Sequence, residues 1–196
     1  MILYPNAKIN IGLNVLQKRT DGYHELSSVF YPVKDLYDIL EILPSSEFSF
    51  SSSGIKIPGE ENICTKAFKM LNQDLGISDV KIHLHKNIPI GAGLGGGSSD
   101  GAFILKALNE LFDLKMSNIQ LEKYALDLGA DCPFFLDNTP KYVTGIGEKM
   151  TNINLDLSNY VIKFVFPDLQ FSTAKAYSSI SPRFFENNLF DLINQP

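Results

Sequence analysis

Six of the chain's 14 glycines fall within 11 residues, and this cluster restricts what the chain can fold into more than any other feature. The segment reads Pro89-Ile-Gly-Ala-Gly-Leu-Gly-Gly-Gly-Ser-Ser-Asp100. A backbone without side chains can turn tightly and direct its N–H groups toward a ligand. The flanking patterns predict a strand before this loop and a helix after it, and the N-terminus of such a helix carries partial positive charge. We therefore expect an anion-binding loop here.

Strand-like and helix-like patterns both occur along the chain, which is typical of an α+β fold. Val80, Ile82 and Leu84 alternate with polar residues, the period of a half-buried strand. Asn62 is a suitable N-cap for a helix, and Gly76 is a suitable end to it. Strands are expected at residues 9–15, 29–33, 38–43, 45–53, 80–84, 142–144 and 160–166, and helices at 62–75, 99–112, 117–128 and 172–179.

Composition narrows the class of protein. With 196 residues, 44% of them hydrophobic and 20% charged, the chain has enough material for one domain or a compact pair. A net charge of −5 without a basic cluster argues against a nucleic-acid partner. No apolar stretch approaches the roughly 20 residues of a membrane span, and the start lacks the pattern of a secretory signal. Two cysteines without metal-ligand spacing fit a reducing compartment, so a cytoplasmic protein is expected, whereas its oligomeric state is left open.

Several glycine-loop chemistries compete for residues 89–100, and spacing separates them. Gly91 and Gly96 have the Walker A spacing, but Gly97 stands where that motif needs lysine. Gly91, Gly93 and Gly96 match the dinucleotide fingerprint literally, yet a helix, not a second strand with an acidic end, is expected next. The protein-kinase loop fails because Ser98 replaces its valine. A dinucleotide-binding module is retained as a third-ranked alternative.

The remaining pattern, Pro-x-x-x-Gly-Leu-Gly-Gly-Gly-Ser-Ser, resembles the ATP-phosphate loop of the GHMP kinase superfamily. Three further motifs lie around it in the order of that superfamily: Pro5-Asn-Ala-Lys-Ile-Asn10, Arg19-Thr-Asp-Gly-Tyr-His24 and Gly129-Ala-Asp-Cys-Pro-Phe-Phe135. Together the four motifs are similar to the family that phosphorylates a cytidine diphosphate ester of methylerythritol in the non-mevalonate isoprenoid route. The resemblance covers residues 5–147. It implies ATP as a substrate, with Mg²⁺ as its usual companion.

Lys8 and Asp131 are the candidate catalytic residues. From the residues alone, a lysine on the polar face of a strand is more often solvated, and an aspartate after Gly129 is more often a helix cap. The resemblance places both on the family's catalytic pair, with Asp131 as the general base and Lys8 as its partner. It also implies ATP binding by Pro89, Ile90, Gly91, Ala92, Gly93, Leu94, Gly95, Gly96, Gly97, Ser98 and Ser99, with Asn62 and Lys86 near the adenosine.

The acceptor side of the site is assigned by the same resemblance. Tyr23 and His24 match the family's cytosine-binding pair, and Tyr177 stands where a second aromatic side chain would stack on the base. Asn10 shares the strand face of Lys8 and is a candidate hydrogen-bonding partner of the substrate. No metal site is expected, because His83 and His85 have no third ligand at a suitable spacing.

The resemblance also carries an expected domain division. It implies the GHMP kinase fold, with an N-terminal ATP-binding domain at residues 1–150 and an incomplete C-terminal domain at 151–196. The chain ends before the glycine-rich segment of the family's C-terminal domain, so we expect a truncated second domain. The alternatives are another GHMP small-molecule kinase of the homoserine or mevalonate type, or a catalytically incomplete nucleotide-binding fragment. Gly101 departs from the family's alanine-rich helix start and is expected to loosen the loop.

Overall fold

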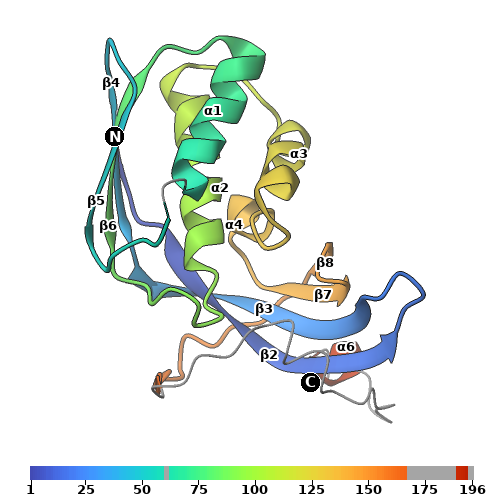
Figure 1. The fold of residues 1–196 in the computed structure, drawn as a ribbon. Coiled ribbons are helices and arrows are strands. Elements are labelled where there is room, and N and C mark those ends of the chain that lie inside the picture. The colour runs from blue at the N-terminus through green and yellow to red at the C-terminus, as the bar shows by residue number, and fades with distance from the viewer. Residues whose placement is uncertain (60–61, 167–188, 194–196) are drawn as a thin grey trace. The chain divides into compact units, whose positions relative to one another are not determined.

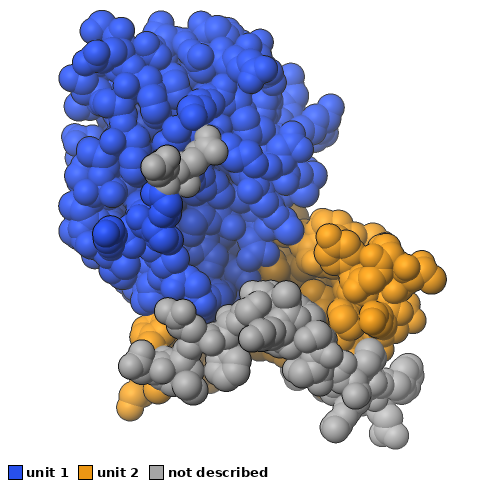
Figure 2. All heavy atoms as spheres, viewed as in Figure 1, with its two compact units in different colours: residues 1–9, 32–138 blue, residues 10–31, 139–196 orange. Residues whose placement is uncertain are grey.

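A computed structural model describes residues 1–59, 62–166 and 189–193 of the chain. The described residues divide into two compact units, one built from residues 1–9 and 32–138 and the other from residues 10–31 and from 139 onward (Figure 2). Strands and helices both contribute to the structure, in the order β1 (Ile2–Leu3), β2 (Asn6–Lys18), β3 (His24–Tyr37), β4 (Ile39–Pro44), β5 (Ser49–Gly54), α1 (Ile63–Leu75), β6 (Val80–Lys86), α2 (Gly96–Leu111), α3 (Asn118–Leu128), α4 (Phe134–Asp137), β7 (Lys141–Gly145), β8 (Lys149–Asn152) and α6 (Leu189–Ile193).

The first unit contains a four-stranded sheet in the order β1-β4-β6-β5, with α1, α2 and α3 on one side of it (Figure 1). β4 and β6 pair antiparallel, whereas β5 pairs parallel to β6 and forms an edge of the sheet. The alternation expected for β6 is confirmed, because Val80, Ile82 and Leu84 are buried. Each such side chain stabilises the fold by about 1.5–3 kcal/mol when fully buried.

Helix α2 is the central element of this unit, and most of its side chains are buried. It packs against α1, α3 and α4. At Gly101, an added Cβ would lie 2.9 Å from Ile63 Cγ1 on α1 and 3.3 Å from Leu128 Cδ1 on α3. Gly101 therefore permits the close approach of these helices, a packing role that we did not expect; its effect on the loop stays a prediction.

A second four-stranded sheet, in the order β2-β3-β7-β8, is joined by antiparallel pairing of β3 with β7 and of β7 with β8. β2 and β3 are long strands that each run through the division between the two units. At Gly12, β2 adopts the left-handed conformation, with φ of 63°. An added Cβ at Gly12 would lie 3.0 Å from Leu189 Cδ1 of α6.

Most of the expected elements are present, with different boundaries. Helix α1 is capped as expected, by Asn62 at its start and by Gly76 at its end. Ser117 caps α3 through a capping box with Gln120. Helix α2 begins at Gly96, three residues earlier than expected, because Gly95 is its N-cap in a left-handed conformation.

One expected strand is wrong, and two of the smaller elements were not foreseen. Residues 160–166 form no strand; Val161 and Val165 are highly exposed, and no described strand hydrogen-bonds to this segment. An apolar run makes a strand only where a neighbouring strand pairs with it. The expected helix at 172–179 lies outside the described residues. α4 and β8, of four residues each, are too short to show a period. The expected domain boundary near residue 150 stays a prediction.

Candidate active site

The glycine-rich loop joins the end of β6 to the start of α2, the order expected from the sequence. Gly91, Gly93 and Gly95 adopt φ values of 76°, 74° and 68°. Only glycine takes this left-handed conformation without strain, so alternating glycines allow the backbone to reverse repeatedly within a few residues. Gly96 and Gly97 belong to the first turn of α2, whose backbone N–H groups have no partner within the helix. The loop therefore leads directly into a helix N-terminus, where anions are stabilised.

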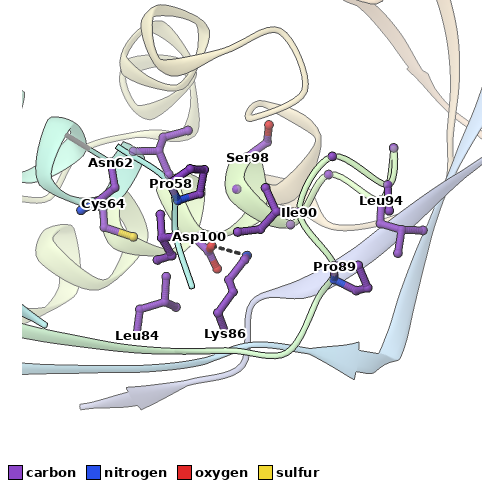
Figure 3. Close-up of a pocket in the computed structure, with 18 residues that line it drawn as sticks. Pro58, Asn62, Cys64, Leu84, Lys86, Pro89, Ile90, Leu94, Ser98 and Asp100 are labelled. Carbon is purple, nitrogen blue, oxygen red and sulfur yellow. Dashed lines mark hydrogen bonds and ion pairs between the residues drawn. The ribbon is translucent and has the colours of Figure 1, made fainter. Parts of the chain in front are cut away.

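A cavity of about 470 Å³ lies against this loop (Figure 3). Its lining combines the glycine-rich loop with residues before and within α1, at the end of β6 and at the start of α2. Such a volume falls within the range of small-molecule binding sites. The lining residues outside the loop are Ile57, Pro58, Asn62, Ile63, Cys64, Leu84, Lys86, Ser98 and Asp100.

Lys8 and Asp131 are brought together, although 122 residues separate them in the chain. Lys8 Nζ lies 3.2 Å from Asp131 Oδ2; the lysine side chain is buried, whereas the carboxylate is about one-third exposed. Lys8 lies near the start of β2, and Asp131 lies in the turn between α3 and α4. An ion pair with one buried member and one partly exposed member leaves the carboxylate accessible to a second molecule.

The backbone of Lys8 also fixes the glycine-rich loop. Its N–H donates to the carbonyl of Leu94 at 2.8 Å. At the next residue, Gly95, an added Cβ would lie 2.9 Å from Lys8 Cγ and 2.9 Å from Phe135 Cζ. The absence of a side chain at Gly95 therefore lets the loop, the Lys8 side chain and the start of α4 pack together.

The two serines that end the glycine motif are placed differently. Ser98 is half-buried, lines the cavity and forms a hydrogen bond with the Cys132 thiol. Ser99 is fully buried, and its hydroxyl has no hydrogen-bond partner among the residues that the structure describes. Burial raises the pKa of the Cys132 thiol to about 11, so this neighbour of Asp131 stays neutral.

Asn62 and Lys86, expected near the adenosine of ATP, both line the cavity and also have partners within the protein. The Asn62 side chain accepts a hydrogen bond from the Thr65 N–H at 3.0 Å, as the cap of α1. Lys86 is buried between two carboxylates that we did not identify from the sequence, Asp38 and Asp100. Their signal in the sequence is weak, because an aspartate at a strand or helix boundary is usually an exposed turn or cap residue.

Tyr23, His24 and Asn10, three of the residues expected on the acceptor side, lie in the second unit. Tyr23 is 60% exposed and directly precedes β3, where His24 is the first residue. Asp21 Oδ1 accepts a hydrogen bond from the Tyr23 N–H at 3.1 Å, while Arg19 contacts the carboxylates of Asp21 and Glu25. The hydrogen bond from Arg19 lowers the pKa of Asp21.

Two other residues, Asn10 and Tyr177, were also expected on the acceptor side. Asn10 is exposed on β2, two residues after Lys8. Tyr177 lies outside the described residues.

Residues 62–138 of the chain match the family described as the GHMP kinases N terminal domain. Over 202 residues, the chain is 48% identical to a Bacteroides thetaiotaomicron protein named 4-diphosphocytidyl-2-C-methyl-D-erythritol kinase, with 100% of this chain and 73% of that protein covered. A Cytophaga hutchinsonii protein of the same name is 44% identical over 199 residues, again with 100% and 73% covered.

Solved structures give a similar picture. One described as the crystal structure of 4-(cytidine 5'-diphospho)-2C-methyl-D-erythritol kinase is 35% identical, with a TM-score of 0.79, and the match covers 93% of this chain and 65% of that one. The mevalonate kinase of Methanococcus jannaschii has a TM-score of 0.54 at 17% identity, with 79% and 56% covered, which shows a common fold alone. The chain therefore spans about 73% of the length of its curated relatives and 65% of that first structure.

Replacement of Gly95 by alanine tests how tightly this loop is packed. Gly95→Ala and Gly93→Ala both force alanine into a left-handed conformation, which costs about 1–2 kcal/mol each. Only at Gly95 does the new methyl group meet Lys8 and Phe135, whereas nothing lies within 4 Å at Gly93. We expect Gly95→Ala to lower the free energy of unfolding by about 1–3 kcal/mol more than Gly93→Ala, measured by urea denaturation. Equal losses in the two variants would contradict the packing described here.

Proposed function

The chain belongs to the 4-diphosphocytidyl-2-C-methyl-D-erythritol kinase family of GHMP kinases, and we propose that it transfers the γ-phosphoryl group of ATP to the 2-hydroxyl of 4-diphosphocytidyl-2-C-methyl-D-erythritol. The family and the α+β GHMP kinase fold expected from the four sequence motifs are confirmed. The products of the proposed reaction are ADP and the 2-phosphate ester. The reaction would belong to the non-mevalonate isoprenoid route.

The observation that carries this proposal is the position of the Lys8–Asp131 pair. The same residue that contacts Asp131 also donates its backbone N–H to the glycine-rich loop. Phosphoryl transfer needs a phosphate cradle, a positive charge near the transferred group and a group that accepts the proton of the attacking hydroxyl. The phosphate cradle would be formed by the backbone N–H groups of residues 91–97. The positive charge would come from the Lys8 ammonium, and the Asp131 carboxylate would accept the proton.

In the proposed mechanism, Asp131 orients the 2-hydroxyl and accepts its proton as the oxygen attacks the γ-phosphorus. The Lys8 ammonium stabilises negative charge on the transferred group. The bond from the γ-phosphorus to the β–γ bridging oxygen breaks, and that oxygen leaves with ADP. Burial of Lys8 strengthens its electrostatic effect, because little water surrounds its amine.

We propose that Mg²⁺ accompanies ATP. Among the described residues there is no cluster of three or more metal-ligating side chains, so phosphate oxygens would provide most of the ligands. The Ser98 hydroxyl, which lines the cavity beside the glycine-rich loop, is a protein oxygen that would fit this role. When bound, the ion would neutralise charge on the β- and γ-phosphates.

The acceptor is proposed to be recognised through its cytosine base. An exposed Tyr23, held in place by the backbone hydrogen bond to Asp21, offers a stacking surface, and His24 adds a hydrogen-bonding group. An uncharged aromatic surface suits a pyrimidine, whereas a homoserine- or mevalonate-type substrate carries a carboxylate that arginine would bind better.

No helix among the described residues has the length and apolar character to cross a membrane.

The purified chain, given ATP and the cytidine substrate, should form ADP and the 2-phosphate ester, and should not do so with homoserine or mevalonate. Loss of the general base predicts that Asp131→Asn lowers kcat about 10²- to 10⁴-fold while ATP still binds. Asp127→Asn, an exposed aspartate on α3, is the matched control and should keep full activity. ATP binding without turnover by the unmodified chain would instead identify a nucleotide-binding fragment, and preference for NAD over ATP would favour the dinucleotide module.

Tyr23→Ala tests the proposed base recognition. Loss of one stacking contact, worth about 1–3 kcal/mol, predicts a fall of about 5- to 150-fold in kcat/KM for the cytidine substrate, with the KM for ATP unchanged. Tyr23→Phe keeps the ring and should retain most of the activity. Tyr160→Ala, which removes another exposed tyrosine of the same unit, is the control. An equal fall in Tyr23→Ala and Tyr160→Ala would count against a specific contact.

A further inference from the structure

Three charged side chains form a buried cluster beside the cavity. Lys86 Nζ at the end of β6 lies 2.5 Å from Asp38 Oδ2 and 2.7 Å from Asp100 Oδ2 (Figure 3 shows the contact with Asp100). All three side chains are at most 4% exposed. We call Asp38, Lys86 and Asp100 the buried triad.

The buried triad holds both ends of the glycine-rich loop. Asp38 Oδ1 accepts hydrogen bonds from the backbone N–H groups of Asn87 at 2.6 Å and Ile88 at 2.8 Å, which are the first two residues after β6. Asp100 lies in α2, on the other side of the loop. The ammonium of Lys86 joins the two carboxylates, so the chain is fixed immediately before and immediately after the loop.

The charge balance of the triad is unusual. Two carboxylates and one ammonium would leave a net charge of −1 in a buried site, which is costly without a further partner. Asp38 accepts three hydrogen bonds, one from the Lys86 ammonium and two from backbone N–H groups. Asp100 accepts a hydrogen bond from Lys86 and also interacts with the Asp38 carboxyl group, while its Oδ1 has no donor among the residues that the structure describes.

The surroundings of Asp100 favour its neutral form. Burial raises the pKa of Asp100 well above its ordinary value, and Asp38 adds to this effect while Lys86 opposes it. The thiol of Cys64 on α1 also interacts with the triad, and burial raises its pKa well above the ordinary value too, so the thiol is neutral. A proton on Asp100 would make the triad neutral as a whole.

We propose that Asp100 is a positioning residue of the nucleotide site that acts as a neutral carboxylic acid, and that the buried triad is a charge-neutral clamp on both ends of the glycine-rich loop. This inference rests on the proposed function in one respect, that the loop binds ATP. A neutral clamp holds the loop in shape without placing negative charge beside the triphosphate. The backbone N–H groups then dominate the local potential.

Calorimetric titration with ATP tests the clamp, using Asp100→Asn, Asp100→Ala and, as the matched control, Glu110→Gln on the exposed face of α2. Asparagine has the shape of the neutral acid, so Asp100→Asn should keep the Kd for ATP within about twofold. Asp100→Ala loses the link from α2 to Lys86 and should raise the Kd about tenfold, the effect of one lost buried hydrogen bond to a charged group. Where turnover is measurable, the KM for ATP should rise and kcat should change little.

Three outcomes would overturn the proposal. Equal losses in Asp100→Asn and Asp100→Ala would mean that an ionised carboxylate is required. An unchanged Kd, or tighter binding, in Asp100→Ala would mean that the triad does not position the loop. A fall in kcat without a rise in KM would place Asp100 in the chemistry instead.

Thermal melting provides a second measurement. It tests whether Asp100 is a neutral acid even if Asp100→Ala does not fold. An acid with a raised pKa keeps its proton in the folded chain and loses it in the unfolded chain, so the unmodified protein loses stability as pH rises from the ordinary range of aspartate toward the folded value. Asp100→Asn lacks this loss. We expect its melting temperature relative to the unmodified protein to increase by about 3 °C or more between pH 5 and pH 8.

A relative melting temperature that stays constant, or decreases, over this range would overturn the neutral-acid assignment. ATP binding and melting require no transfer to the cytidine substrate. A failure of the clamp is therefore distinguishable from a failure of the proposed kinase activity.

Discussion

The hydrogen bond from the Lys8 N–H to the Leu94 carbonyl is the interaction on which the rest of the site depends. It joins the start of β2 to the glycine-rich loop, so the residue that contacts Asp131 is fixed directly to the proposed phosphate cradle. Gly95 makes this junction possible, because any side chain there would displace Lys8 or Phe135. In the proposed mechanism, the distance between the transferred phosphoryl group and its general base is thus set by backbone contacts, which are stiffer than exposed side chains.

The structure also explains how an acidic chain can hold a polyphosphate. The net charge is −5, and Lys8 and Lys86, two cationic side chains near the loop, are both buried and both paired with carboxylates. In the proposed site, attraction for the triphosphate therefore comes mainly from oriented N–H groups and the N-terminus of α2. This arrangement favours a ligand of the right shape over anions in general, because partial charges act only at short range.

The sequence predicted the parts of the fold that local rules determine. Asn62 and Gly76 predicted the two ends of α1, and the period-2 pattern predicted β6. The strand predicted at residues 160–166 was wrong because an apolar run alone does not determine whether a segment forms a strand. Strand formation also depends on pairing with other parts of the chain. The pairing of Lys8 with Asp131 came from the family resemblance. Asp38 and Asp100 were missed because their importance depends on burial, which spacing does not reveal.

Backbone amide signals provide the most direct test of the central claim, that the glycine-rich loop binds the triphosphate of ATP through its N–H groups. In a ¹⁵N-labelled chain, addition of ATP should shift the amide signals of Gly91, Gly93, Gly95 and Gly97. The signals of Ser51 and Ser53 on the edge strand β5 should stay unchanged. Unmoved glycine signals at saturating ATP, or shifts confined to residues outside the loop, would contradict the account.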